Sequence, residues 1–128
     1  MIERIPSDFP HLNCPAKDLE EVFYHLAKNA LQAMSSADSH KLVLRASLGF
    51  TPKEDRAAFL YIGDTGPGIS PEDLPRVFEA FYTTKPPQEG SGLGLAITRR
   101  LIEKYSGRIS VSSFPGAGTT FTLCLPVA

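Results

Sequence analysis

The stretch Asp64-Thr65-Gly66-Pro67-Gly68-Ile69 organises the rest of the chain, because it follows an apolar run over residues 57–62 and precedes a helix-start signal at Ser70-Pro71-Glu72. A strand that ends in a carboxylate and then breaks into two glycines marks a place where the backbone bends tightly or lets another molecule come close. An ordinary strand-to-helix turn uses the same residue types. A second glycine cluster, Gly90-Ser91-Gly92-Leu93-Gly94-Leu95, opens another helical segment, and two such loops together predict one shared ligand.

Length, charge and cysteine usage predict one soluble domain with no nucleic-acid partner. The chain has 128 residues, a length that predicts one hydrophobic core. Its formal net charge of −1 provides no positive electrostatic potential that would attract a polyanion such as nucleic acid. The longest apolar run has six residues, far short of the roughly 20 that span a bilayer. Cys14 and Cys124 lie in no metal-binding spacing, so we expect a reducing, cytoplasmic setting.

Apolar periodicity predicts three helices. Residues 17–34 carry a broad apolar stripe at helical spacing, which is typical of a helix packed on a core. A short second helix is expected from Pro71 to about Phe78, and a third over residues 92–105, which ends at Ser106-Gly107 as helices often do. The segment over residues 79–90 has no period, and loops of that length are often functional lids.

Alternating apolar residues predict two antiparallel hairpins. The first joins strands near residues 42–48 and 57–62, and the second joins strands near residues 109–111 and 121–125. Residues 1–15 suit at most one or two short edge strands, because three prolines interrupt them. The whole pattern predicts an α/β two-layer sandwich, with helices on one face of a largely antiparallel or mixed sheet.

Asp64 and the glycines after it suit the recognition of a base. An ionised carboxylate only accepts hydrogen bonds, so Asp64 in a pocket would bind an exocyclic amine such as that of adenine. Gly66 and Gly68 would let the backbone pass close to that base. The second glycine cluster opens a helix whose free N–H groups and dipole favour an anion such as phosphate. Its spacing fits neither a P-loop nor a dinucleotide-binding fingerprint.

Further polar residues are candidates for the same site. Asn29 lies at the edge of the apolar stripe of the first helix, with His25 one turn before it, and its amide oxygen suits a hard cation such as Mg²⁺. Lys85 can supply a mobile positive charge to a terminal phosphate, and Thr119 can reach a base through a water. Each has an ordinary alternative: a solvent-edge amide, a solvated surface lysine and a strand threonine kept for packing.

Five segments of the chain resemble, in order, the N, G1, F, G2 and G3 boxes of the sensor histidine kinase ATP-binding domain, which belongs to the superfamily shared with gyrase B, Hsp90 and MutL. The segments are Asn29-Ala30, Asp64 to Ile69, Phe78-Glu-Ala-Phe81-Tyr-Thr-Thr-Lys85, Gly90 to Ala96 and Gly116-Ala-Gly-Thr-Thr-Phe121. The match runs from about Leu19 to Leu125. It implies the Bergerat-type ATP-binding fold, a mixed, mostly antiparallel sheet of about five strands covered on one face by three helices.

The resemblance implies a role for each matched residue. Asn29 is similar to the Mg²⁺ ligand, and Asp64 to the carboxylate that recognises the adenine amino group. Lys85 resembles a lid residue that approaches the phosphates, and Thr119 a residue that helps to bind adenine through water. Phe78 and Phe81 resemble the aromatic hinge of the lid. The other positions expected to bind ATP line the base pocket, belong to that hinge, or end the lid at the phosphates: Gly66, Gly68, Ile69, Phe81, Gly90, Gly92, Leu93 and Gly94.

The chain departs from the resemblance at two points. His25 stands where histidine kinases usually carry a second Asn, and where the ATP-hydrolysing and serine-phosphorylating relatives usually carry a Glu as general base. The missing carboxylate argues against a hydrolase, although an imidazole can bind phosphate or act as a base near neutral pH; a helix-surface histidine without a role is the alternative. In addition, none of His11, His25 and His40 has the context of a phosphate-accepting histidine.

The sequence therefore predicts that residues 1–128 are a single catalytic and ATP-binding domain of a two-component sensor histidine kinase, of bacterial origin and without its dimerisation and phosphoacceptor domain. It would bind ATP with Mg²⁺ and pass the γ-phosphoryl group to a histidine on that separate domain, with Asn29, His25 and Lys85 taking part in catalysis. The expected parent is a homodimer, cytoplasmic or membrane-anchored, that signals to a response regulator, while this fragment is monomeric. Two alternatives stay open: an anti-sigma-factor-like serine kinase, which His25 disfavours, and a nucleotide-binding pseudokinase.

Overall fold

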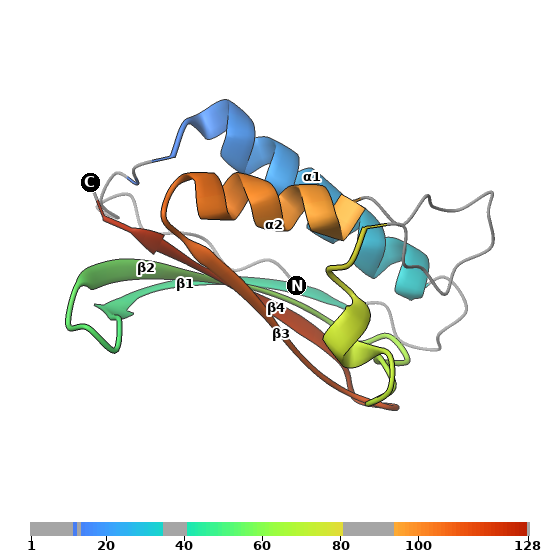
Figure 1. Cartoon of the computed structure of the whole chain (residues 1–128). Coiled ribbons are helices and arrows are strands. Elements are labelled where there is room, and N and C mark those ends of the chain that lie inside the picture. Colours follow the sequence, from blue (N-terminus) through green and yellow to red (C-terminus); the bar gives the residue numbers. More distant parts are fainter. Residues whose placement is uncertain (1–11, 13, 35–40, 81–93, 128) are drawn as a thin grey trace.

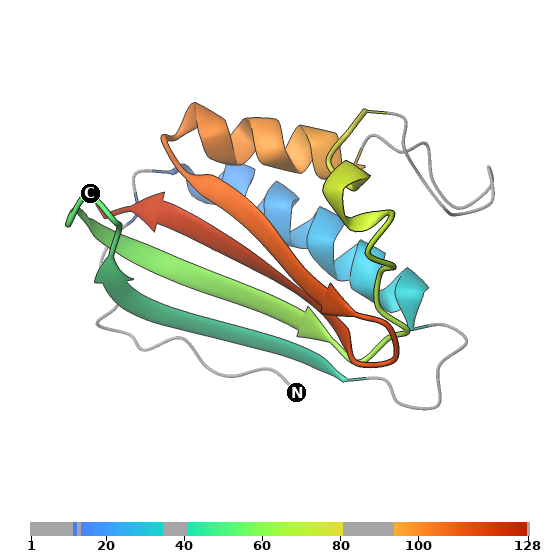
Figure 2. The same cartoon turned by 60° about the horizontal axis from the view of Figure 1, so that its bottom comes forward.

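The computed structural model of the protein describes residues 12, 14–34, 41–80 and 94–127, and within them two α-helices lie on one face of a four-stranded sheet (Figures 1 and 2). The helices are α1 (Ala16–Ala33) and α2 (Gly94–Lys104), and a short 3-10 helix, η1 (Leu74–Arg76), follows the second strand. The strands are β1 (Leu42–Phe50), β2 (Arg56–Asp64), β3 (Arg108–Phe114) and β4 (Gly118–Pro126). This is the two-layer α/β sandwich that the sequence predicts.

The predicted apolar stripe of α1 faces the core. Val22 and Leu26 are fully buried and form one cluster with Ile102 of α2 and the core-facing residues of β2 and β4. The two helices run antiparallel (Figure 1), so the C-terminal end of α1 and the start of α2 lie at the same end of the sheet. At the opposite end the Tyr105 hydroxyl donates to the Asp18 carboxylate, and this bond raises the pKa of Tyr105 to about 12. Neither of the α-helices that the structure describes is long and apolar enough to cross a bilayer.

The strand order is β1-β2-β4-β3, and each neighbouring pair is antiparallel. The two predicted hairpins are confirmed as β1–β2 and β3–β4. Because β4 lies between β2 and β3, the chain between β2 and β3 crosses the helical face of the sheet (Figure 1). This topology brings Asp64, the last residue of β2, directly opposite Thr119 of β4, and places Ser113 of β3 on the other side of Thr119.

The structure differs from two details of the predicted fold. The expected second helix, from Pro71 to Phe78, is replaced by the three residues of η1 with turns on either side. Pro75 at the middle of that segment has no N–H to donate to a helical hydrogen bond, and so short a segment lacks the support that a helix draws from packing a long apolar face.

The sheet also differs from the expected five strands. The described residues contain four strands, all antiparallel. From the predicted N-terminal edge strand, Leu12 forms an isolated antiparallel bridge with Val127, and residues 1–11 lie outside the described part of the chain. Most of the predicted lid, residues 81–90, lies outside it as well. Within the described residues α2 spans Gly94–Lys104, and residues 92 and 93 of the predicted third helix lie outside them.

Candidate functional site

Three chain segments meet at the end of the sheet where α1 ends and α2 begins (Figures 1 and 2). They are the loop that follows Asp64, the end of β3 and the start of β4. In an antiparallel pair, directly opposite residues share one face of the sheet. Asp64, Thr119 and Ser113 are such neighbours, and the buried residues next along β2 and β4, Ile62 and Phe121, belong to the core. All three polar residues therefore lie on the helical face, at the edge of the core.

Asp64 is a half-buried carboxylate held by the backbone. Its Oδ1 accepts a hydrogen bond of 2.8 Å from the N–H of Gly66. Burial raises the pKa of Asp64 above its ordinary value of 3.8, against the lowering effect of hydrogen bonds from the backbone N–H groups of Gly66 and Thr119. A carboxylate has about four acceptor positions, so two backbone bonds leave capacity for the N–H groups of a ligand.

Two glycines let these segments pack closely. Gly68 has φ +81°, and a Cβ at this position would collide with the carbonyl oxygen of Phe114. Gly118 has φ +89°, and a Cβ there would collide with the carbonyl oxygen of Asp64. Both backbones therefore require glycine for conformation and for space. For Gly68 the close neighbour is β3, so the protein's own packing accounts for this glycine without a ligand.

The loop after Asp64 also contacts α1. A Cβ on the buried Gly66 would lie 3.4 Å from the carbonyl oxygen of Ala33, and the Thr65 hydroxyl contacts the sulfur of Met34 at 3.7 Å. The same hydroxyl oxygen accepts a 3.0 Å hydrogen bond from the N–H of Lys41. These contacts fix the loop against the C-terminal end of α1.

Ser113 ties the three segments together. Its Oγ accepts a hydrogen bond of 2.7 Å from the N–H of Ile69, lies 2.9 Å from the carbonyl oxygen of Gly118 and lies 2.9 Å from Oγ1 of Thr119. The sequence motifs do not include Ser113. A signal was present, however, because Ile109, Val111 and Ser113 occupy one face of β3, and a serine stands where the alternation calls for an apolar residue.

The polar edge of α1 faces the start of α2. The Nδ1 atom of His25 lies 3.7 Å from the position that a Cβ on Gly94 would occupy. Its Nε2 lies 3.8 Å from Oε1 of Glu21, one turn earlier. Asn29, one turn later, is half-buried. The structure thus brings His25 and Gly94 together, with Asn29 on the adjoining turn of α1.

Phe78 is the one residue of the predicted lid hinge that the structure describes. Its ring makes an edge contact with Phe121, with centroids 6.2 Å apart and an interplanar angle of 76°. The guanidinium of Arg99 on α2 lies 5.8 Å from the centroid of the same ring, within the range of a cation–π interaction. The remaining predicted site residues of this region lie outside the described residues: Phe81, Lys85, Gly90, Gly92 and Leu93.

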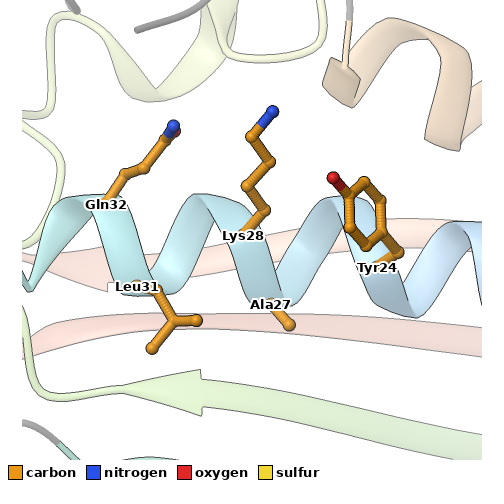
Figure 3. Close-up of a pocket in the computed structure, with 5 residues that line it drawn as sticks. All are labelled: Tyr24, Ala27, Lys28, Leu31 and Gln32. Carbon is orange, nitrogen blue, oxygen red and sulfur yellow. The ribbon is translucent and has the colours of Figure 1, made fainter.

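A hollow lies on the surface of α1, and Figure 3 labels the side chains that line it. Its five lining residues all belong to that helix: Tyr24, Ala27, Lys28, Leu31 and Gln32. Tyr24 and Leu31 are 62% and 60% exposed. Neither Asp64 nor Thr119 lines this hollow, so it is a surface of one helix and not part of the site at the end of the sheet.

Comparison with known proteins decides the family. A family model described as "Histidine kinase-, DNA gyrase B-, and HSP90-like ATPase" matches residues 14–128. The chain belongs to this family. As a histidine kinase-type ATPase domain, it is 33% identical over 120 residues to sporulation kinase E of Bacillus subtilis, covering 94% of this chain and 15% of that protein. It is 36% identical over 110 residues to the sensor protein FixL of Bradyrhizobium diazoefficiens, covering 86% of this chain and 21% of that protein.

Solved structures agree with this family and fold. The mycobacterial sensor histidine kinase MprB superposes with a TM-score of 0.70 at 30% identity, over 88% of this chain and 72% of that chain. Full-length ShkA, solved in complex with AMPPNP, superposes with a TM-score of 0.71 at 27% identity, over 95% of this chain and 24% of that chain. The chain spans 15% of the length of sporulation kinase E and 21% of the length of FixL.

Proposed function

We propose that this chain is the ATP-binding catalytic domain of a two-component sensor histidine kinase, which binds ATP with Mg²⁺ and passes the γ-phosphoryl group to a histidine on a separate dimerisation domain. The observation that carries the proposal is the convergence of Asp64, Thr119 and the start of α2 at one end of the sheet, in a chain whose family match spans residues 14–128. The AMPPNP complex of ShkA, a structural neighbour, supports a nucleotide ligand.

The base would be recognised at the sheet end of the site. Asp64 would accept a hydrogen bond from the exocyclic amine of adenine, and Thr119 lies directly opposite it. The loop of Gly66, Gly68 and Ile69 flanks the carboxylate and is fixed to α1 and β3 by the contacts above. A half-buried acceptor with a raised pKa is the kind of group found at binding sites.

The phosphates would lie toward the helices. Gly94 begins α2, whose N-terminal N–H groups and dipole favour an anion. Asn29 would hold Mg²⁺ through its amide oxygen, an oxygen ligand of the type that this ion prefers. Bound Mg²⁺ would neutralise charge on the phosphate oxygens. On the resemblance, Lys85 would add a positive charge, and the other lid residues Phe81, Gly90, Gly92 and Leu93 would close over the nucleotide.

His25 belongs to the phosphate side of the proposed site, because its imidazole faces the start of α2. A histidine in place of a glutamate provides no permanent negative charge to activate water, so we assign the chain phosphoryl transfer rather than hydrolysis. Oε1 of Glu21 lies 3.8 Å from Nε2 of this imidazole.

The accepting histidine would come from outside residues 1–128, which we treat as the catalytic domain without its dimerisation and phosphoacceptor domain. Catalysis would then consist mainly of positioning and charge neutralisation, as in other phosphoryl transfers. A homodimeric parent, a response regulator that receives the phosphoryl group, and a cytoplasmic location for this domain belong to the same proposal.

Phosphoryl transfer in a two-component mixture tests the proposal. The chain is incubated with γ-labelled ATP, Mg²⁺ and the dimerisation domain of its parent gene, and a parallel reaction uses that domain with its acceptor histidine replaced by alanine. We expect an acid-labile phosphoryl product with the intact acceptor and none with the alanine variant. An acid-stable product would indicate a serine kinase, and tight ATP binding without transfer would indicate a pseudokinase.

A further inference from the structure

Ser113 occupies a position that neither the sequence motifs nor the proposed base site explains. It lies at the end of β3 on the helical face, beside the buried Thr119, which is 6% exposed. Three groups contact its single oxygen: the N–H of Ile69, the carbonyl oxygen of Gly118 and the hydroxyl of Thr119. A serine hydroxyl has one proton to donate and two lone pairs that accept.

These three contacts fix the directions of the hydrogen bonds. The Ile69 N–H can only donate, so it uses one lone pair of Ser113. The Gly118 carbonyl can only accept, so the Ser113 proton points to it. The contact of 2.9 Å with Thr119 is then a hydrogen bond only if Thr119 donates its proton into the second lone pair of Ser113. This is the one assignment in which all three contacts are hydrogen bonds.

Thr119 therefore presents lone pairs, and no proton, to a ligand. Asp64 directly opposite is also an acceptor while it is ionised. We propose that Ser113 is a specificity-determining positioning residue, which makes this end of the site accept only, so that it favours a purine with an amino group at C6 over one with a carbonyl oxygen there. In place of that amino group, a carbonyl oxygen at C6 would be a third acceptor facing the acceptor oxygens of Asp64 and Thr119, and these oxygens would repel it.

This inference rests on the proposed nucleotide site, and it predicts a ratio of affinities rather than an affinity. In Ser113→Ala, Thr119 loses the acceptor for its proton and can turn the proton toward a ligand oxygen. The variant should weaken ATP binding and tolerate inosine triphosphate better. We expect the ratio of the Kd for inosine triphosphate to the Kd for ATP to fall by about tenfold, the effect of one hydrogen bond of ordinary strength.

The experiment is isothermal titration of both nucleotides, with Mg²⁺, into the wild-type chain and matched variants. Ser112→Ala is the control, because Ser112 is the exposed neighbour on the opposite face of β3, and it should leave the ratio unchanged. Ser113→Thr keeps the hydroxyl and should retain the wild-type ratio. Thr119→Val removes the hydroxyl acceptor that faces the ligand and leaves the contact between Ser113 and Ile69 in place, and it should lower the ratio even if Ser113→Ala does not fold.

The outcomes separate this inference from the proposed function. If Ser113 only supports the loop, Ser113→Ala weakens both nucleotides by the same factor and leaves the ratio unchanged, which overturns the inference while ATP binding stands. An unchanged ratio in Thr119→Val, or a wild-type chain that binds both nucleotides equally, overturns it too. A wild-type chain that binds neither nucleotide would contradict the proposed function itself.

Discussion

The two ends of the candidate site, which we propose bind the base and the phosphates, are built in different ways. At the base end, backbone N–H groups, a strand-end carboxylate and two glycines lock three segments together, so that Asp64, Ser113 and Thr119 are positioned by the sheet itself. At the proposed phosphate end, the imidazole of His25 on α1 faces Gly94 at the start of α2. From this difference we expect base recognition to depend on the packing of the sheet, and phosphate binding to depend on single side chains such as His25.

Breaking the backbone packing of the base end should have the largest effect. Gly118→Ala adds a Cβ against the Asp64 carbonyl at a left-handed φ, and we expect it to lower the free energy of unfolding by about 2 to 5 kcal/mol. Gly116→Ala is the matched control, because Gly116 also has φ +81° but no atom lies within 4 Å of its added Cβ; it should cost only about 1 to 2 kcal/mol. Urea unfolding of both variants measures the difference, and equal losses would show that the close packing at Gly118 contributes nothing.

Removing the charge of the base end without changing its shape should affect binding rather than folding. Asp64→Asn should weaken ATP binding by roughly 1 to 3 kcal/mol, which is about 5- to 150-fold in Kd, because a charged acceptor at a half-buried contact is lost. Asp55→Asn, in the exposed turn between β1 and β2, is the control and should bind as wild type. Titration calorimetry measures both, and unchanged affinity in Asp64→Asn would remove Asp64 from the site.

The raised pKa of Asp64 gives ATP affinity and folding stability opposite pH dependences. Because the folded pKa lies above the unfolded value, this group contributes stability that is present below about pH 3.8 and is lost as the pH rises through the raised pKa. ATP affinity should instead fall as the pH drops through the same pKa, since a protonated Asp64 is no longer a charged acceptor. Binding and urea titrations from neutral pH downward, on wild type and Asp64→Asn, measure both trends. The variant should lack the Asp64 component of each, and the idea fails if the two proteins behave alike.

Loss of the Asn29 side chain at the proposed phosphate end should cause a smaller change in ATP affinity, and this change should depend on Mg²⁺. Asn29→Ala should weaken ATP binding by about tenfold, or 1.4 kcal/mol, when Mg²⁺ is present, and should change it little in the presence of a chelator. Lys28→Ala, the neighbouring residue on the solvent face of α1 (Figure 3), is the control. If Mg²⁺ strengthens ATP binding to Asn29→Ala as much as to wild type, Asn29 is structural.

The sequence predicts well what local periodicity determines. The apolar stripe of α1 and the alternation in both hairpins were sufficient to predict these elements and their buried faces. Core-facing residues such as Val22, Leu26 and Leu123 repeat at the period of the helix or strand that carries them. The expected helix from Pro71 to about Phe78 was wrong, because Pro75 near its centre has no N–H to donate to a helical hydrogen bond, and only the three residues of η1 form there.

The sequence predicts the candidate site residues that belong to a single motif, but not the contacts between residues of different segments. Asp64 and its glycines stand out in the sequence, but the placement of Thr119 opposite Asp64 depends on β4 lying between β2 and β3, and no local pattern specifies that order. The approach of His25 to Gly94 likewise follows from the packing of α1 against α2. Ser113 is visible in the sequence as a polar residue on an otherwise apolar face of a strand. Its structural role could not be predicted, because it depends on three contacts with residues that the fold brings close.

A crystal structure of the chain with Mg²⁺ and a non-hydrolysable ATP analogue tests the central claim most directly. We predict the exocyclic amine of adenine within hydrogen-bond distance of the Asp64 carboxylate, and the metal on the side-chain oxygen of Asn29. A nucleotide bound elsewhere, or an end of the sheet that stays filled by the protein's own side chains at saturating ligand, would contradict the claim.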